Sequence, residues 1–140
     1  MTREGFRKLI ILQWLLTFAY FIVYFATLDY LPPQLLAYRS ELQNAEPTTK
    51  DWFVVTTAFL LFLCCIITSI GLYKFKAWAK KLLLLILAVN LIIAPFSGVC
   101  IQSEWASTVA YLICLVEGGI LFLVFLSPVS QMFETDGDYV

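Results

Sequence analysis

Four long apolar blocks limit the fold of this chain more than any other feature of its sequence, and they cover residues 9–28, 53–73, 78–96 and 106–126. Each block is close to the roughly 20 residues that an α-helix needs to cross the hydrocarbon core of a bilayer. Of the 140 residues, 61 % are hydrophobic and 14 % charged, whereas about 25 % of a typical soluble domain is charged. We therefore expect an all-α fold, a four-helix transmembrane bundle that forms a single integral-membrane domain over residues 1–140.

The first block follows three basic residues, as the apolar part of a signal peptide does. It is longer than such an apolar region, and no small-residue cleavage motif follows it. We expect it to stay in the protein as a helix. At the other end, residues 127–140 read as a short acidic tail, because Ser127-Pro128 favours the end of the fourth helix and acidic residues follow.

The basic residues predict the orientation in the membrane, because Lys and Arg in short loops stay on the cytoplasmic side. Arg3, Arg7 and Lys8 precede the first block, and Lys74, Lys76, Lys80 and Lys81 lie around the link between the second and third blocks. Seven of the nine basic residues thus lie on one side. The expected topology has both termini in the cytoplasm. We interpret the four lysines as contacts for lipid headgroups rather than for nucleic acid.

The outer loop between the first two blocks contains a candidate surface helix. Pro33 suits the first turn of a helix, and Leu35, Tyr38 and Leu42 follow at helical spacing. We expect a short amphipathic helix on the outer membrane surface. It could cap the ends of the spans, or it could be a docking surface for a protein partner or ligand, with Gln43 on its polar side.

The chain lacks the residues of common catalytic sites and metal sites. It has no histidine and no C-x-x-C pair, which removes most zinc, haem and copper sites and the usual general base. We expect no cofactor, no metal and no enzymatic activity. Three cysteines lie within the blocks and Cys100 lies in the outer loop, so a disulfide within the chain is not expected; an intermolecular one through Cys100 stays open.

Glu117 is the strongest candidate for a functional residue, because it lies in the middle of the fourth block. A charged side chain at this depth costs at least about 2.5–3.5 kcal/mol, so it is rarely left facing lipid. Without a counter-ion at its depth, we expect the neutral form unless a partner or water stabilises the charge. The predicted polar site within the membrane consists of Glu117 with Asn90, Cys64, Cys65 and Thr68.

Small residues recur every four positions in the same block, at Ala106, Ala110, Cys114 and Gly118. Such a stripe lets another helix backbone approach closely. We expect a helix–helix interface along it, either within one subunit or between subunits of a homo-oligomer. Glu117 lies on the flank of this stripe, so its carboxyl group is expected to point into protein.

Three segments, "LPPQLLAY", "GLYKFKAWAKKLLLLILAVN" and "SEWASTVAYLICLVEGGILFLVFLSPVSQMF", resemble a widespread group of small bacterial inner-membrane proteins with four predicted spans. The resemblance covers nearly the whole chain. It implies a bacterial inner membrane and the same four-span layout, and it implies no activity or functional residue.

Two functions follow as hypotheses. The first is a non-catalytic accessory or immunity-type protein that binds a membrane partner or an intruding protein through its membrane-embedded faces and its outer loop. The alternative is a small oligomeric channel or carrier for ions or protons that uses Glu117. In the first case Glu117 donates a hydrogen bond that fixes the helix register, and in the second it binds and releases a proton or cation.

Overall fold

The computed structural model describes residues 2–44, 46, 48–96 and 101–133, and it confirms the all-α bundle with four helices long and apolar enough to cross a membrane. The long helices are α1 (Arg3–Ala26), α3 (Thr49–Tyr73), α4 (Ala77–Ile93, extended by η2, Ala94–Phe96) and α5 (Glu104–Leu126). The shorter elements are η1 (Leu28–Tyr30), α2 (Pro33–Asn44) and η3 (Pro128–Phe133). This architecture is that of a multi-pass membrane protein.

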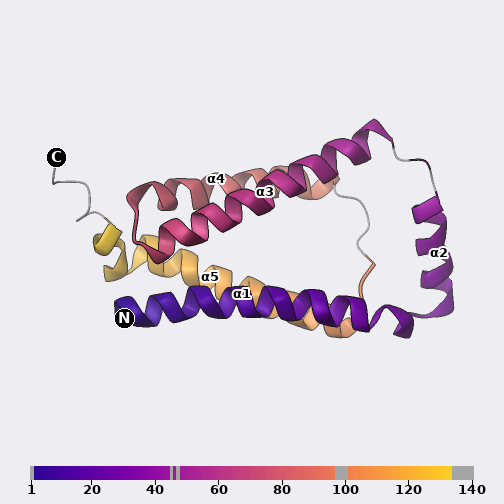
Figure 1. The fold of residues 1–140 in the computed structure, drawn as a ribbon, viewed down its shortest axis with the longest axis horizontal. Coiled ribbons are helices and arrows are strands. Elements are labelled where there is room, and N and C mark those ends of the chain that lie inside the picture. The colour runs from indigo at the N-terminus through magenta and orange to yellow at the C-terminus, as the bar shows by residue number, and fades with distance from the viewer. Residues whose placement is uncertain (1, 45, 47, 97–100, 134–140) are drawn as a thin grey trace.

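The four long helices are arranged as two pairs, α1 with α5 and α3 with α4. The pairs lie close together at the end that holds the N-terminus and the link between α3 and α4, and they separate toward α2, as Figure 1 shows. We call these the packed end and the α2 end. The predicted site residues lie between the two.

The hydrophobic core is concentrated at the packed end. Its centre is an aromatic cluster in which the ring of Phe6 lies 5.6 Å from that of Phe75 and 5.9 Å from that of Phe133, between ring centroids. Phe6 and Phe133 are fully buried. The rest of this core consists of Ile10, Leu72, Ala79, Ile120, Val124 and Val129. All four long helices therefore meet at this end through apolar contacts.

A tight turn between α3 and α4 places Phe75 in that cluster. The amide of Lys76 donates to the carbonyl of Gly71, and that of Phe75 donates to the carbonyl of Leu72. These two bonds form a Schellman motif, in which a glycine normally takes the left-handed position. Phe75 takes it here, with φ at 56°, at a cost of about 1–2 kcal/mol. Its buried ring offsets this strain through the aromatic cluster.

Gly71 allows α3 and α4 to cross closely. A Cβ atom at this position would lie 2.6 Å from the ring of Trp78 and 2.7 Å from the Cβ of Ala79. No side chain fits there without a shift of α4. Gly71 therefore marks a close approach between α3 and α4. Cβ atoms added at Gly118 or Gly119, by contrast, would meet nothing within 4 Å.

The segment after α5 differs from the tail that the sequence predicts from residue 127 onward. Pro128–Phe133 forms the 3₁₀ helix η3, which folds back onto α5. Val129 and Phe133 are buried in the core, and Lys80 donates to the hydroxyl of Ser130 over 2.7 Å. The first part of the predicted tail is thus part of the packed end; residues 134–140 lie outside the described residues.

The helix starts follow local capping rules. Thr48 caps α3 and exchanges hydrogen bonds with Asp51, as in a capping box. Ser103 accepts from the amide of Ala106 at the start of α5.

The predicted surface helix is present as α2, and it crosses the α2 end between the two helix pairs (Figure 1). Its apolar residues Leu35 and Leu42 are exposed rather than buried on the spans.

Candidate functional site

A pocket lies between the two helix pairs and takes lining residues from all four long helices. Its volume is about 100 Å³. The polar part of the lining comprises Gln13 from α1, Cys65, Thr68 and Ser69 from α3, Asn90 from α4 and Glu117 from α5. The remaining lining residues are apolar, and two of them, Leu72 and Ile120, belong to the core of the packed end.

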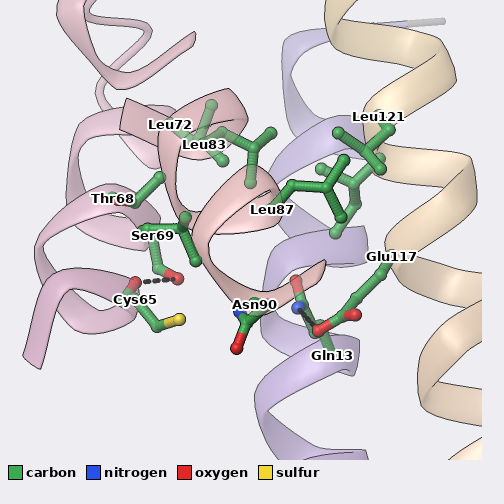
Figure 2. A pocket seen from close by; sticks show the side chains of 12 residues that line it. Gln13, Cys65, Thr68, Ser69, Leu72, Leu83, Leu87, Asn90, Glu117 and Leu121 are labelled. Carbon is green, nitrogen blue, oxygen red and sulfur yellow. Dashed lines mark hydrogen bonds between the residues drawn. The ribbon is translucent and has the colours of Figure 1, made fainter. Parts of the chain in front are cut away.

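Glu117 is held by a hydrogen bond from Gln13. The side-chain amide Nε2 of Gln13 donates to the carboxyl oxygen Oε1 of Glu117 over 2.9 Å. Figure 2 shows the two side chains pointing toward each other from α1 and α5, with Asn90 of α4 and Cys65 of α3 around the same pocket. The carboxyl group therefore points into the space between helices, as the sequence predicts, and not into open hydrocarbon.

Gln13 was not predicted as the partner of Glu117, although its position in the sequence indicates a matching depth. Gln13 lies ten residues after the start of α1 at Arg3, and Glu117 lies nine residues before the end of α5 at Leu126. At 1.5 Å per residue these positions are about 15 and about 14 Å from the packed end. Matching depths in antiparallel helices, together with the single amide in the first span, would have pointed to this pair.

The other predicted polar residues divide into two groups. Cys65 and Asn90 line the pocket with Glu117, as expected. Thr68 also lines it, but its buried hydroxyl donates to the carbonyl of Cys64 within its own helix, over 2.7 Å. Cys64 does not line the pocket. Ser69, which the sequence analysis left out, does line it and donates to the carbonyl of Cys65.

Among the described residues that line this pocket, none is Lys or Arg. An ionised Glu117 would therefore have the amide of Gln13 but no cationic side chain in the pocket to balance its charge. Leaving a carboxylate uncompensated at this depth costs several kcal/mol. The site is thus suited either to a protonated carboxyl group or to a carboxylate with a bound cation.

Two further polar contacts lie between the pocket and the α2 end. The hydroxyl of Tyr20 donates to the side-chain oxygen of Gln102 over 3.0 Å. Seven residues after Tyr20, the hydroxyl of Thr27 shares a hydrogen bond with that of Ser103, the residue next to Gln102. Both contacts join the C-terminal part of α1, or the residue that caps it, to the two residues just before α5. In the opposite direction the pocket meets the apolar core.

The small-residue stripe has a mixed outcome. Ala106 is fully buried within the chain, but Cys114 and Gly118 are exposed, and the space around Gly118 is open. The half of the stripe nearest Glu117 therefore makes no close helix contact within one chain. An interface between subunits along Ala110, Cys114 and Gly118 stays a prediction.

The lysines at the link between α3 and α4 do not all project outward. Lys74, Lys76 and Lys81 are exposed, which fits the predicted headgroup contacts. Lys80 instead turns toward the C-terminal segment, where its ammonium group bonds to Ser130 and lies 5.7 Å from the centre of the Phe133 ring. Lys80 therefore stabilises the position of η3.

Within the described residues, no cluster of three or more His, Cys, Asp or Glu side chains could hold a metal ion. Cys64, Cys65 and Cys114 are free thiols. Cys100, the candidate for an intermolecular disulfide, lies outside the described residues.

No protein-family model matches the chain, and no curated protein or solved structure is similar to it. The proposed function is therefore based on the geometry and polarity of the site.

Proposed function

We propose that this protein is a small channel or carrier that binds a proton or a small monovalent cation at Glu117, in the middle of the bilayer. The observation that carries this proposal is the Gln13–Glu117 hydrogen bond at the wall of a pocket that is also lined by four further polar residues. A path for ions needs more than one polar group at this depth, and Asn90, Ser69 and Cys65 provide them.

The charge of the ligand follows from the number of carboxylates. Glu117 is the only acidic side chain among the described residues of the pocket lining, whereas protein sites for divalent calcium commonly combine several carboxylates. A single carboxylate balances one positive charge, so a proton or a monovalent cation is the best fit. A pocket of about 100 Å³ can also hold a few water molecules, because one needs at least about 10–15 Å³.

The route of entry follows from the uneven distribution of polar groups. The aromatic cluster of Phe6, Phe75 and Phe133 blocks the packed end with apolar side chains. The contacts of Tyr20 with Gln102 lie on the other side of Glu117. The ligand therefore enters from the α2 end, and passage to the packed end requires the core there to open.

A flux measurement tests this proposal. Purified protein is placed in liposomes, and the collapse of a pH gradient, or of a sodium or potassium gradient, is followed with an indicator dye. We expect faster collapse than in empty liposomes, and Glu117→Gln abolishes the difference because the amide cannot ionise. Glu117→Gln keeps the size and hydrogen-bonding capacity of the side chain, so folding should be preserved.

Cys64→Ser is a matched control, because Cys64 lies at a similar depth but outside the pocket lining. It should leave the flux unchanged. For a metal cation, the flux should also fall as the pH is lowered, because protons compete for the same carboxylate. Equal fluxes with wild-type protein, Glu117→Gln and empty liposomes would contradict the proposed function.

The proposed location is a bacterial inner membrane, with the packed end and both termini on the cytoplasmic side and α2 outside. The clustering of basic residues at the packed end supports this orientation: Arg3 begins α1, Arg7 lies about one turn later, and Lys74 and Lys76 lie between α3 and α4. A homo-oligomer would place the open side of α5, at Cys114 and Gly118, against a second copy.

The second candidate function is binding of a protein partner, in an accessory or immunity-type role. The exposed apolar side chains of α2, which are 40 % exposed at Leu35, 43 % at Tyr38 and 49 % at Leu42, favour it. A photo-crosslinking residue at position 38 in native membranes should capture one defined protein. Recovery of lipid alone would count against this function without affecting the flux prediction.

A further inference from the structure

An apolar groove runs along the outside of the bundle between α1 and α3, separate from the Glu117 pocket. It encloses about 500 Å³. Its walls are formed by Ile10, Ile11, Trp14, Leu15 and Phe18 on α1 and by Ile66, Ser69, Ile70 and Tyr73 on α3. Ser69 is the one aliphatic alcohol in the lining, and its hydroxyl is already bonded to the carbonyl of Cys65. The groove therefore offers a mainly apolar surface, to which the indole N–H of Trp14 and the phenol hydroxyl of Tyr73 add two polar groups.

Two cations stand at the end of the groove nearest the packed end, one from each wall. On α1, Arg7 precedes Ile11 by four residues and Trp14 by seven, so it continues the same helix face by one turn. Lys74, the residue that caps the end of α3, follows Ile66 and Ile70 at intervals of four residues. The groove thus ends in positive charge.

Arg7 is fixed in place and keeps capacity for an anion. Its Nε donates to the carbonyl of Tyr73 over 3.3 Å, and its guanidinium group lies 4.9 Å from the centre of the Tyr73 ring. These contacts leave the terminal N–H groups of the guanidinium, which suit a phosphate. In the part of the chain that the structure describes, neither Arg7 nor Lys74 pairs with a carboxylate.

The length of the groove matches one leaflet of a membrane. Phe18 lies eleven residues beyond Arg7 on α1, about 16 Å along the helix axis. Half of a hydrocarbon core of about 30 Å is about 15 Å. A groove of this length with cations at the headgroup level has the shape and charge of a site for a phospholipid with an acidic headgroup.

We propose that this groove binds an anionic phospholipid of the leaflet at the packed end. One acyl chain lies against Trp14 between α1 and α3, and the phosphate is bound by Arg7 and Lys74. The lipid fills the gap between α1 and α3, which make few contacts of their own. The lipid thereby links the two helix pairs next to the pocket, since Ser69 lines both the groove and the pocket.

Quenching of Trp14 fluorescence by brominated lipids tests this site. A variant with Trp52→Phe, Trp78→Phe and Trp105→Phe keeps Trp14 as its single tryptophan, and its folding is checked by circular dichroism and thermal melting. It is placed in phosphatidylcholine vesicles that contain a small fraction of either phosphatidylglycerol or phosphatidylcholine with brominated chains. We expect phosphatidylglycerol to be enriched at Trp14 on the order of tenfold, because each basic residue adds to the attraction.

Substitutions at the cations separate the site from general attraction to a basic protein. Arg7→Gln with Lys74→Gln should remove the preference for phosphatidylglycerol, and Arg7→Lys should keep most of it. Lys81→Gln is the matched control, because Lys81 is exposed near the same end but is not on the groove; it should leave the preference unchanged.

Three results would overturn the proposal. The first is equal quenching of Trp14 by the two brominated lipids in a folded protein. The second is an equal loss of preference in Lys81→Gln. The third is quenching of Trp14 by neither lipid, which would mean that a protein helix covers the groove. None of these results depends on whether Glu117 supports ion flux.

Discussion

The packed end and the α2 end of this bundle differ in how they hold the same four helices together. At the packed end, aromatic and aliphatic side chains such as Phe6 and Phe133 are fully buried. At the α2 end, hydrogen bonds such as that between Tyr20 of α1 and Gln102, just before α5, add to the packing of the buried Ala106, and the two pairs stand apart (Figure 1). The packed end is held by a buried apolar core, whereas the bundle opens from the Glu117 pocket toward the α2 end.

This difference matters because lipid does not drive helices together as water does. Helix association within a bilayer depends on close packing and on hydrogen bonds between helices. The packed end uses the first, through Gly71 and the aromatic cluster. The region around Glu117 uses the second. The bundle can therefore remain assembled while a pocket stays open between its halves.

The largest expected effect is the loss of an aromatic ring at the packed end. Phe133→Ala should lower the free energy of unfolding by about 3–5 kcal/mol, because it removes a buried ring and leaves a cavity. Phe25→Ala at the α2 end is the matched control, since Phe25 is 66 % exposed. Unfolding of both variants in detergent measures the difference, and similar losses would contradict the contrast between the ends.

A pair of glycine variants sharpens the contrast at the level of helix contact. Gly71→Ala should cost about 1–3 kcal/mol, because the added methyl group overpacks α3 against α4. Gly118→Ala should cost nothing or stabilise slightly, because alanine is the better helix former and the site is open. Thermal melting of the two variants separates them.

If Gly118→Ala proved as damaging as Gly71→Ala, the stripe on α5 would be in a close interface that one chain does not contain. Gly118→Leu with a measurement of mass in detergent would then identify that interface. A change in oligomeric state would place a second copy there, and no change would place the contact within the chain.

The hydrogen bond between the two halves of the site should have a smaller effect on stability. Hydrogen bonds between membrane helices average about 0.6 kcal/mol in double-mutant cycles, with a maximum of about 1.7. A cycle of Gln13→Leu, Glu117→Leu and the double variant should give a coupling in this range. A coupling of zero would mean that Gln13 does not hold Glu117.

The smallest effect is expected on α2. Leu42→Ala should change the free energy of unfolding by no more than about 0.5 kcal/mol, as at other exposed sites. Leu42 is 49 % exposed, and none of the α2 side chains that the structure describes is buried. A loss of several kcal/mol in the same unfolding assay would show that α2 is a cap on the bundle rather than a link.

The sequence predicted the spans well because their signal is local. Apolar blocks of membrane-crossing length correspond to α1, α3, α4 and α5, and Pro33 correctly marked the start of α2. The position of Glu117 in the middle of its span also predicted that its side chain faces protein. These properties depend on composition and on rise per residue alone.

The pairing of helices could not be read in the same way. In an apolar helix nearly every face is compatible with either lipid or protein, so the residues that touch are set by tertiary packing. The sequence placed Gly118 in a predicted packing stripe and gave Gly71 no such role, although of these two glycines it is Gly71 that lies against another helix. Phe133 follows a proline in a short segment with little periodicity, and its burial depends on a cluster formed by α1 and the turn at Phe75.

The central claim is that water reaches the Glu117 pocket from the α2 end, and its most direct test is the labelling of two neighbouring cysteines in a background without the native ones. Asn90 lines the pocket, whereas Leu91 does not line it and is 76 % exposed on the bundle surface at the same depth. A membrane-impermeant thiol reagent is added to either side of liposomes that contain oriented protein. The account predicts that Asn90→Cys is labelled from the α2 side and that Leu91→Cys is protected by lipid. Equal protection of both cysteines, or labelling of Asn90→Cys from the side of the packed end, would contradict it.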